Sequence, residues 1–484
     1  MSGVISRRQT VASLSAVAAL SLARCGRLIA GAGGAGRLPE LRIGNREITL
    51  VAHEVSTAIL PDGPPSPTWL FGAHLFPVLR MRRGERATVT LRNALPQHTS
   101  IHWHGVRVPN AMDGVPYLTQ RPVLPGERFT YRFEPPDAGT FFFHPHCNTA
   151  EQLGRGLIGM LIVDDDAPTF DDDLVLVLKD WRLARDGIFN SFVTLAGASR
   201  AGTFGNLRTV NGHPSPRIEI PGGANIRMRL VNADSTRILS VGLGGTSASV
   251  IAIDGNPVAP FALDTWRLGP AMRLDLALRS PRDGEIRLID YFDETPVTLA
   301  SLAPRGAPAR NDVFTARPLP ANSLRAPDMA AAWTHTLELG AGVVPLDIPD
   351  PPPIVLPDGS RVNIADALCL ASATFWMLDG KSWPLREHGR LPPPLFSFDR
   401  GQSVVLEFRN ATKRAHPIHI HGHTMRVLSA SILPRPVHHA DTVLVMPNER
   451  VKVAFVADNP GNWMIHCHII EHQETGMMGW FRVS

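Results

Sequence analysis

The chain has 484 residues, enough for about three domains, and is 44% hydrophobic and 19% charged. Its net charge of +4 comes from interspersed basic and acidic residues, which excludes a basic stripe and predicts no nucleic-acid partner. The 41 Gly and 43 Pro separate short apolar runs and leave little room for long helical periodicities, so the composition predicts an all-β protein of antiparallel barrels or sandwiches.

Residues 1–36 are typical of an export signal. The pair Arg7-Arg8 precedes a modest apolar run, Val11–Ala23, which is too short and too rich in Ser and Ala for a transmembrane helix. Ala30-Gly31-Ala32 fits a signal-peptidase site. We interpret the segment as a twin-arginine signal, a route that carries folded proteins, although a chance arginine pair in an ordinary secretory signal is the alternative. The prediction is a periplasmic protein with no stable membrane anchor.

The first predicted domain spans residues 38–166. Ala87–Arg92 and Phe129–Phe133 alternate apolar and polar residues, as half-buried strands do. Two His-x-His motifs lie at predicted strand ends, and they contribute His102, His104, His144 and His146.

The second predicted domain spans residues 167–310 and contains the apolar runs Leu174–Leu178 and Ile226–Asn232. Its one histidine, His213, has no histidine or cysteine nearby, so we interpret it as a turn or surface residue and the domain as a spacer without metal. Residues 311–335, within a Pro- and Ala-rich stretch, are the predicted linker, and a second Pro-rich stretch follows at 345–358.

The third predicted domain spans residues 336–484. Val404–Asn410 resembles Thr88–Asn93 of the first domain, each lying before a histidine motif, and Val231-Asn232 fits the same place in the second. This internal similarity suggests three copies of one Greek-key barrel.

The segment that concentrates the chemistry lies near the C-terminus. If it is a strand, the side chains of His466 and His468 point one way and that of Cys467 points the other way. Cys467, His472 and Met477 follow one another at intervals of five residues. A thiolate, an imidazole and a thioether, with a second imidazole, make the ligand set of a blue-copper electron-transfer site.

The second imidazole is predicted to come from the motif around residue 419. By the same alternation His419 and His421 share a face, while His416 can turn toward the cysteine. The inward histidine pairs of the four motifs then supply eight imidazoles, more than one copper takes and enough for a three-copper cluster.

In these four motifs, which span residues 102–477 in the expected order, the chain resembles the multicopper oxidases, the family of laccases and cuprous oxidases. The resemblance implies three cupredoxin-like domains and four coppers. It places one type 1 copper on His416, Cys467 and His472 with Met477 axial. It places the type 2 copper on His102 and His419. It places the type 3 pair on His104, His144, His146, His421, His466 and His468.

The resemblance also implies that O2 is reduced to water with electrons from a small-molecule or metal-ion donor. A laccase-like enzyme for phenols is favoured over a cuprous oxidase because the 13 Met are scattered and form no Cu(I)-binding run. A copper-free scaffold relative is disfavoured since no ligand is lost, and nitrite reductase because it does not use eight cluster histidines. Asp113 matches the family's proton-assisting acid, with a turn residue as the alternative. Gln473 replaces a Glu found in many bacterial relatives, so a second proton route is open to question.

The remaining cysteines and histidines receive plainer interpretations. Cys147 and Cys369 are predicted to be buried free thiols rather than a disulfide. His423 is expected not to bind metal. His438 and His439 are placed on a loop, either solvated or lining the donor entrance.

Overall fold

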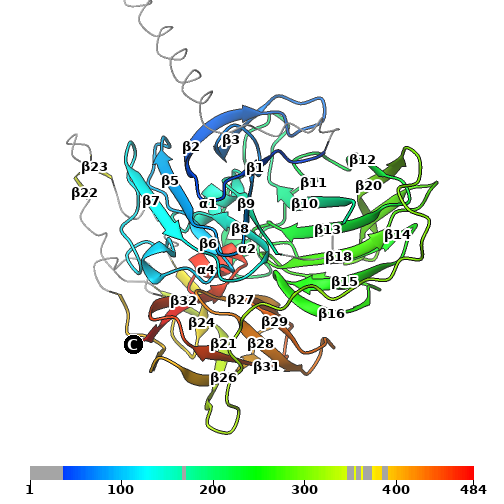
Figure 1. Ribbon diagram of the computed structural model, residues 1–484. Coiled ribbons are helices and arrows are strands. Elements are labelled where there is room, and N and C mark those ends of the chain that lie inside the picture. The colour runs from blue at the N-terminus through cyan, green and yellow to red at the C-terminus, as the bar shows by residue number, and fades with distance from the viewer. Residues whose placement is uncertain (1–35, 166–169, 346–353, 356–360, 363–372, 384–390) are drawn as a thin grey trace, which may run out of the picture.

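The described part of the computed structural model covers residues 36–165, 170–345, 354–355, 361–362, 373–383 and 391–484, and nearly all of its regular structure is β (Figure 1). Apart from Gly36, the predicted signal segment lies outside the described residues, as does Cys369. No helix among the described residues is long and apolar enough to cross a membrane. The all-β prediction is confirmed.

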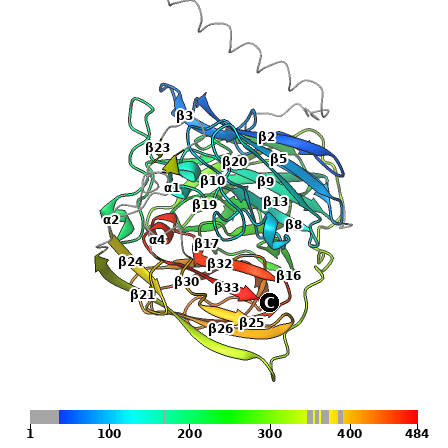
Figure 2. The same cartoon turned by 90° about the vertical axis from the view of Figure 1, so that its left-hand side faces the viewer.

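The strands form three pairs of sheets, one pair from each third of the chain (Figures 1 and 2). The first pair contains β1 (Glu40–Arg42), β4 (Val78–Arg82), β9 (Gly159–Asp164), β8 (Gly139–His144) and β6 (His102–His104), with β3 (Ser66–Phe71), β2 (Glu47–Thr57), β5 (Ala87–Asn93) and β7 (Arg128–Phe133). The second contains β11 (Leu207–Val210), β10 (Asp172–Trp181), β13 (Asn225–Asn232), β18 (Arg273–Arg279), β15 (Ala248–Ile253) and β16 (Asn256–Ala262), with β12 (Arg217–Pro221), β20 (Val297–Arg305), β19 (Ile286–Asp290), β14 (Leu239–Gly244) and β17 (Trp266–Leu268).

The third pair contains β24 (Ala373–Leu378), β21 (Trp333–Pro345), β26 (Gln402–Asn410), β31 (Arg450–Ala457), β28 (Met425–Ala430) and β29 (His438–Ala440), with β25 (Phe396–Phe398), β33 (Met478–Val483), β32 (Gly461–Cys467), β27 (His416–Ile420) and β30 (Thr442–Val445). A small ribbon of β22 (Ile354–Val355) and β23 (Arg361–Val362) stands apart. The short helices are η1 (Asn110–Met112), α1 (Thr149–Gly154), α2 (Leu195–Ala198) and α4 (Ile470–Glu474).

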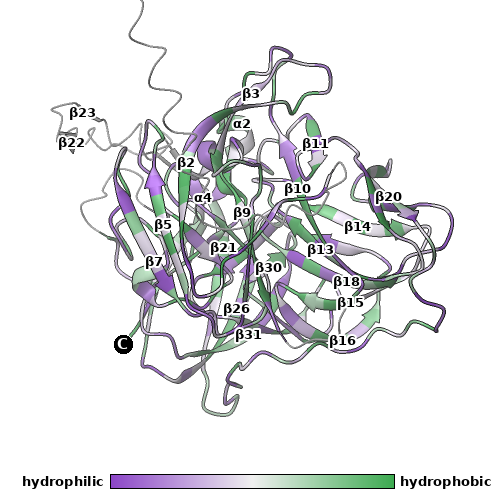
Figure 3. Ribbon diagram, turned by 45° about the horizontal axis from the view of Figure 1, so that its top comes forward, coloured by the Kyte–Doolittle hydropathy of each residue, from purple (hydrophilic) through white to green (hydrophobic). Residues whose placement is uncertain are grey.

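Burial along the strands explains why these sequences form them. The edge strands β7 and β12 carry exposed residues next to buried ones, whereas β10, which lies between β11 and β13, is buried almost throughout. Figure 3 shows hydrophilic and hydrophobic residues mixed along β5 and β7. Each sheet pair encloses its own apolar core, and a further apolar cluster joins the first and second pairs and includes Ile470 of α4. The strands predicted around residues 90, 130, 176, 229 and 407 are all present.

The extended conformation predicted for the C-terminal motif holds only as far as Cys467. The chain then turns through the one-turn helix α4, and Gly476, at φ +117°, lets it return as β33. This return brings the backbone carbonyl of Met477 to 3.0 Å from the amide of Cys467. Residues 306–332 form neither helix nor strand, and the predicted domain boundaries around them remain a prediction.

Asp173 joins the first and second sheet pairs. Its carboxylate accepts hydrogen bonds from Arg229 at 2.6 and 2.8 Å and from Arg80 at 2.6 Å. Burial opposes ionisation, but Arg229 and Arg80 outweigh it and lower the pKa of Asp173 to about 2.

We expect Asp173→Asn to lower the free energy of unfolding by about 2 kcal/mol at pH 5 and above. The pKa of Asp173 is lower in the folded than in the unfolded protein. Its carboxylate therefore contributes its full stabilisation at pH values above the unfolded pKa near 4, and this contribution is lost as the pH falls toward 2. Urea unfolding of both proteins at neutral pH and near pH 2 checks this. A difference between the urea midpoints of the two proteins that is the same at both pH values would contradict this expectation.

Candidate copper centres

Eight buried histidines from four segments meet between the first and third sheet pairs. In the first pair, β6 and β8 set His102 opposite His144. In the third pair, β27 and β32 set His419 opposite His466. The remaining four each lie two residues further along the chain, and they are His104, His146, His421 and His468. Two pairs of adjacent strands therefore face each other across one buried space.

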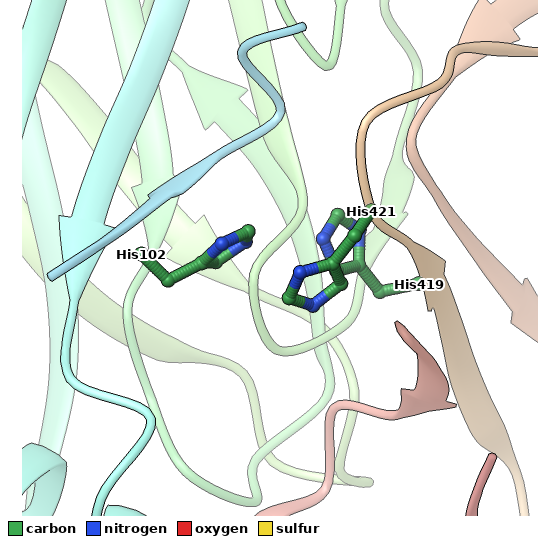
Figure 4. Close-up of side chains that lie close together, drawn as sticks. All are labelled: His102, His419 and His421. Carbon is green, nitrogen blue, oxygen red and sulfur yellow. The ribbon is translucent and has the colours of Figure 1, made fainter. Parts of the chain in front are cut away.

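The rings of the two groups interleave. His102 stacks on His421 with ring centroids 3.9 Å apart, and His104 stacks on His419 at 3.7 Å. Figure 4 shows His102 reaching toward His419 and His421 from the opposite strand. The four motifs predicted to converge on one space do so.

The nitrogens that face this space lie close enough together to bind shared metal ions. Nε2 of His421 lies 3.2 Å from Nε2 of His466, and Nε2 of His144 lies 3.4 Å from Nε2 of His468. Among the described residues, the atoms left buried without a hydrogen-bond partner include His102 Nε2, His104 Nδ1, His146 Nε2 and His419 Nε2. Orphaned buried nitrogens are costly unless a ligand satisfies them, so the donor set fits metal ions.

The opposite ring nitrogens are held by protein oxygens. Backbone carbonyls of Asp113, Pro145, Asp441 and Cys467 accept from Nδ1 of His102, His144, His419 and His466 respectively, at 2.9 to 3.0 Å. These bonds fix each ring's tautomer and aim its free nitrogen inward. Burial, with the neighbouring imidazoles, lowers the pKa of His144, His146 and His421 well below the usual range, which keeps them in the neutral form that binds metal.

A second group lies on the other side of the β32 backbone. Sγ of Cys467 is 3.6 Å from Nδ1 of His416 and 3.7 Å from Nδ1 of His472, and these two nitrogens are 3.1 Å apart. His416 begins β27, and His472 lies in α4. One thiol and two imidazole nitrogens thus surround a single point, as predicted, and they suit copper.

The cysteine group is buried and tightly packed. Cys467 and Met477 lie in the same buried apolar cluster, and Trp376 packs on His472 with ring centroids 4.2 Å apart. Burial raises the pKa of the Cys467 thiol and lowers that of His472 to about 3. A bound cation reverses the first effect because it stabilises the thiolate.

The sequence interpretation missed the segment that covers His472. Nε2 of His472 donates to the backbone carbonyl of Arg200 at 2.8 Å, and Trp376 donates to the carbonyl of Ala198 at 2.6 Å. Glu471 fastens the same segment: it accepts from the amide of Thr194 at 2.9 Å, and its carboxylate also bonds the amide of Thr203. The second sheet pair therefore supplies the cover of the cysteine group. No local pattern in residues 194–203 signals this role.

Asp113 lies at the edge of the eight-histidine space, as predicted. It is fully buried, and its Oδ2 accepts from Nδ1 of His421 at 2.9 Å. Its Oδ1 lies 3.3 Å from Nδ1 of His102. Gly114, at φ +82°, permits this placement because a Cβ there would collide with the carbonyl of Ile101.

Asp441 is a second carboxylate at the cluster that was not predicted. Its Oδ1 accepts from Nε2 of His104 at 3.0 Å, and its backbone carbonyl accepts from Nδ1 of His419. Burial opposes ionisation here too, but the adjacent Arg273 dominates and lowers the pKa of Asp441 well below its usual range. Asp441 is therefore a carboxylate that orients two of the eight rings.

Two acids close to Gln473 in sequence, Glu471 and Glu474, bond different parts of the chain. Glu471 faces the cover over His472, whereas Glu474 accepts from the amide of Ala150 in α1 at 2.7 Å. Burial raises the pKa of Glu474 to about 8.

Several other residues are also located. Cys147 is a buried free cysteine, as predicted. His213 is exposed in a turn, and His423 packs among aromatic rings of the third core. The loop prediction for His438 and His439 was wrong: both lie in β29, where pairing with β28 orders them and buries His438.

Comparison with known proteins agrees with this arrangement. Family models described as multicopper oxidase match residues 54–168, 172–284 and 372–484. The multicopper oxidase MmcO of Mycobacterium tuberculosis is 28% identical over 470 residues, covering 89% of this chain and 86% of the relative.

Among solved structures, the multicopper oxidase of Pseudomonas thermotolerans is 36% identical, with a TM-score of 0.80, and the match covers 91% of this chain and 99% of that one. That of Pseudomonas parafulva is also 36% identical, with a TM-score of 0.77 and coverage of 90% and 100%. The prediction of three cupredoxin-like barrels is confirmed by this likeness. The chain belongs to the multicopper oxidases, copper-dependent oxidoreductases that use O2 and a reducing substrate.

Proposed function

We propose that the protein is a laccase-like oxidase, which oxidises a phenolic or related aromatic donor one electron at a time and reduces O2 to water with four of these electrons. In this proposal the type 1 copper would be held by His416, Cys467 and His472, with Met477 as a further ligand. His102 and His419 would hold type 2 copper. The type 3 pair would be held by His104, His144, His146, His421, His466 and His468. The four coppers would supply the one-electron exchange and the reduction of O2.

The observation that carries the proposal is the placement of two groups of metal-binding side chains on opposite sides of one backbone. Cys467 faces His416 and His472, while its chain neighbours His466 and His468 face the eight-histidine space. A few covalent bonds of the backbone around Cys467 therefore join the cysteine group, which would take electrons from the substrate, to the eight-histidine space, where O2 would be reduced.

Protons have a candidate carrier in Asp113. Its carboxylate is buried at the histidine cluster, and Oδ1 has no hydrogen-bond partner among the residues that the structure describes. A group with a free acceptor within reach of the reacting site suits general acid–base work.

The segment that covers His472 carries side chains that suit an aromatic donor. Arg200, whose carbonyl bonds the ring, lies between two exposed apolar side chains in sequence, Leu195 at 66% and Phe204 at 49% exposure. A guanidinium and apolar groups suit aromatic donors through stacking and cation–π contact. The laccase of Pycnoporus cinnabarinus is 26% identical, covering 87% of each chain.

A cuprous or other metallo-oxidase for copper tolerance is the second candidate. The observation in its favour is that His472 is fully buried and its Nε2 donates to the Arg200 carbonyl. A phenol therefore has no direct contact with the ring in this conformation. A copper resistance protein A homolog of Pseudomonas syringae is 26% identical, covering 92% of each chain.

The deciding experiment compares kcat/KM for a dimethoxyphenol and for Cu(I) in the copper-loaded protein. The proposal expects the phenol to be the better donor and Leu195→Ser to lower its kcat/KM roughly 10-fold, the scale of one apolar contact. Val313→Ser, at a side chain 91% exposed, is the matched control and should change neither value. A higher kcat/KM for Cu(I) would favour the second candidate.

Export to the periplasm by the twin-arginine route is part of the same proposal. The finding to expect is a mature N-terminus beyond Ala32 in a periplasmic fraction, with retention in the cytoplasm when Arg7 and Arg8 are both replaced by lysine. An uncleaved chain recovered from the cytoplasm of cells with a working export system would contradict it.

A further inference from the structure

A buried arginine of the second sheet pair reaches the edge of the histidine cluster. Arg273 begins β18 and is 0% exposed. It pairs with Asp441, which lies between β29 and β30 of the third sheet pair and is 1% exposed. This contact crosses between parts of the chain 168 residues apart.

The guanidinium of Arg273 is held on every side. Nη1 and Nη2 donate to the two carboxylate oxygens of Asp441 at 2.8 and 2.5 Å, a bidentate pair. Nε donates to the carbonyl of Thr140 in β8 at 3.1 Å, and Nη1 also donates to the carbonyl of Ala271 at 3.0 Å. One side chain thus joins all three sheet pairs, and β8 is the strand that ends at His144.

Asp441, in turn, sets the direction of two rings. Nε2 of His104 donates to its Oδ1 at 3.0 Å, and Nδ1 of His419 donates to its backbone carbonyl at 2.9 Å. As a result His104 presents Nδ1 and His419 presents Nε2, both buried without a partner, to the cluster space. His419 and His104 stack at 3.7 Å, so a tilt of one ring displaces the other.

Asp254 secures the pair from behind. Its Oδ1 accepts from the backbone amide of Arg273 at 2.8 Å, and its Oδ2 accepts from the amide of Thr442 at 3.1 Å. Thr442 also donates from its hydroxyl to Asp441 at 2.8 Å. Asp254 therefore fixes the backbones that carry both members of the pair.

The first histidine motif makes room for this pair. Gly105 follows His104 directly and has φ +82°. A Cβ there would collide with Oδ2 of Asp441 and with Nη2 of Arg273. Glycine is therefore required at position 105 because the Arg273–Asp441 pair, from the other two sheet pairs, takes the space of a side chain.

We propose that Arg273 is a positioning residue for the type 2 copper side of the cluster, acting through Asp441 on His419 and His104. This rests on the proposed copper assignment, and it gives the second sheet pair, expected to be a spacer, a part in the oxygen-reducing site. The competing explanation is that the buried pair only fastens the three sheet pairs together. The two explanations differ in whether copper, and not only stability, responds to a change at Arg273.

The test compares Arg273→Lys with Arg229→Lys. Arg229 is a matched control because it is equally buried in the same sheet, pairs with Asp173 and reaches Thr140 of β8 through the hydroxyl at 2.8 Å. Lysine keeps each charge but removes the bidentate fork. Both variants should lower the Tm. Only Arg273→Lys should weaken type 2 copper, by roughly 10- to 100-fold in Kd by chelator titration, because that is the usual effect of losing a partner of a metal-bound histidine.

The spectroscopic readouts separate the outcomes. Arg273→Lys is expected to alter or lose the type 2 copper EPR signal while the absorption of the cysteine site stays as in the unaltered protein. If Arg273→Lys does not fold, Asp254→Asn replaces it, with the same change expected in smaller degree. Wild-type EPR and copper affinity in the folded variant would overturn the proposal. Absence of copper binding by the unaltered protein would overturn the copper assignment instead.

Discussion

Cys467→Ser is expected to abolish the blue absorption of the copper-loaded protein and to lower donor oxidation by roughly three orders of magnitude or more, the scale on which loss of an essential group acts. Sγ of Cys467 lies 3.6 and 3.7 Å from the Nδ1 atoms of His416 and His472, and a hydroxyl is a poor substitute for a thiolate toward copper. The eight histidines on the far side of β32 are untouched, so about three coppers per chain should remain. Absorption spectra, copper analysis and oxygen uptake measure these effects.

Cys147→Ser is the matched control for this substitution. Cys147 is also fully buried, and its Sγ donates to Oγ of Ser100 at 3.8 Å. Burial raises its pKa to about 12, which keeps it a thiol. We expect Cys147→Ser to keep both colour and activity. Retained blue absorption in Cys467→Ser would exclude the assignment of the thiolate.

Asp113→Asn has the second largest expected effect, a fall in kcat of about 10²- to 10⁴-fold, the usual range for loss of a general acid or base. The amide keeps the size of the side chain and can still bond the Nδ1 atom of His421, which lies 2.9 Å from Oδ2, but it cannot take up and release a proton. Anaerobic bleaching of the blue band by the donor should keep its rate, because that step occurs on the other side of β32. Stopped-flow absorption and oxygen uptake distinguish the two steps.

Asp137→Asn is the control for Asp113→Asn. Asp137 is a buried carboxylate of the same sheet pair, and it bonds Arg107 at 2.7 Å. Its loss should reduce stability and leave turnover of the folded protein unchanged. If Asp113→Asn reoxidises with O2 as fast as the unaltered protein, another group carries the protons. Glu474, buried against α1, is then the next residue to replace.

The sequence alone determined the fold class, and it predicted which residues gather in the two groups. Alternation of side chains in an extended chain is a local property, so the opposite directions of Cys467 and of His466 and His468 follow from the backbone geometry of three residues. The same rule placed His419 and His421 together. The strand prediction ended too late, at α4, but the short return loop still brings His472 to 3.7 Å from Sγ of Cys467 and Met477 into the same apolar cluster.

Only the tertiary structure decided what surrounds these ligands. Asp441 lies 337 residues from His104, and Arg273 lies 168 residues from Asp441, so no spacing along the chain links them. The Arg200 carbonyl over His472 belongs to the backbone, which every residue type carries equally. Such contacts form where the three sheet pairs meet. Asp441, Arg273 and Arg200 are ordinary residues within their own segments. Only the packing of these segments shows that each one satisfies a buried charge or a ring nitrogen elsewhere in the chain.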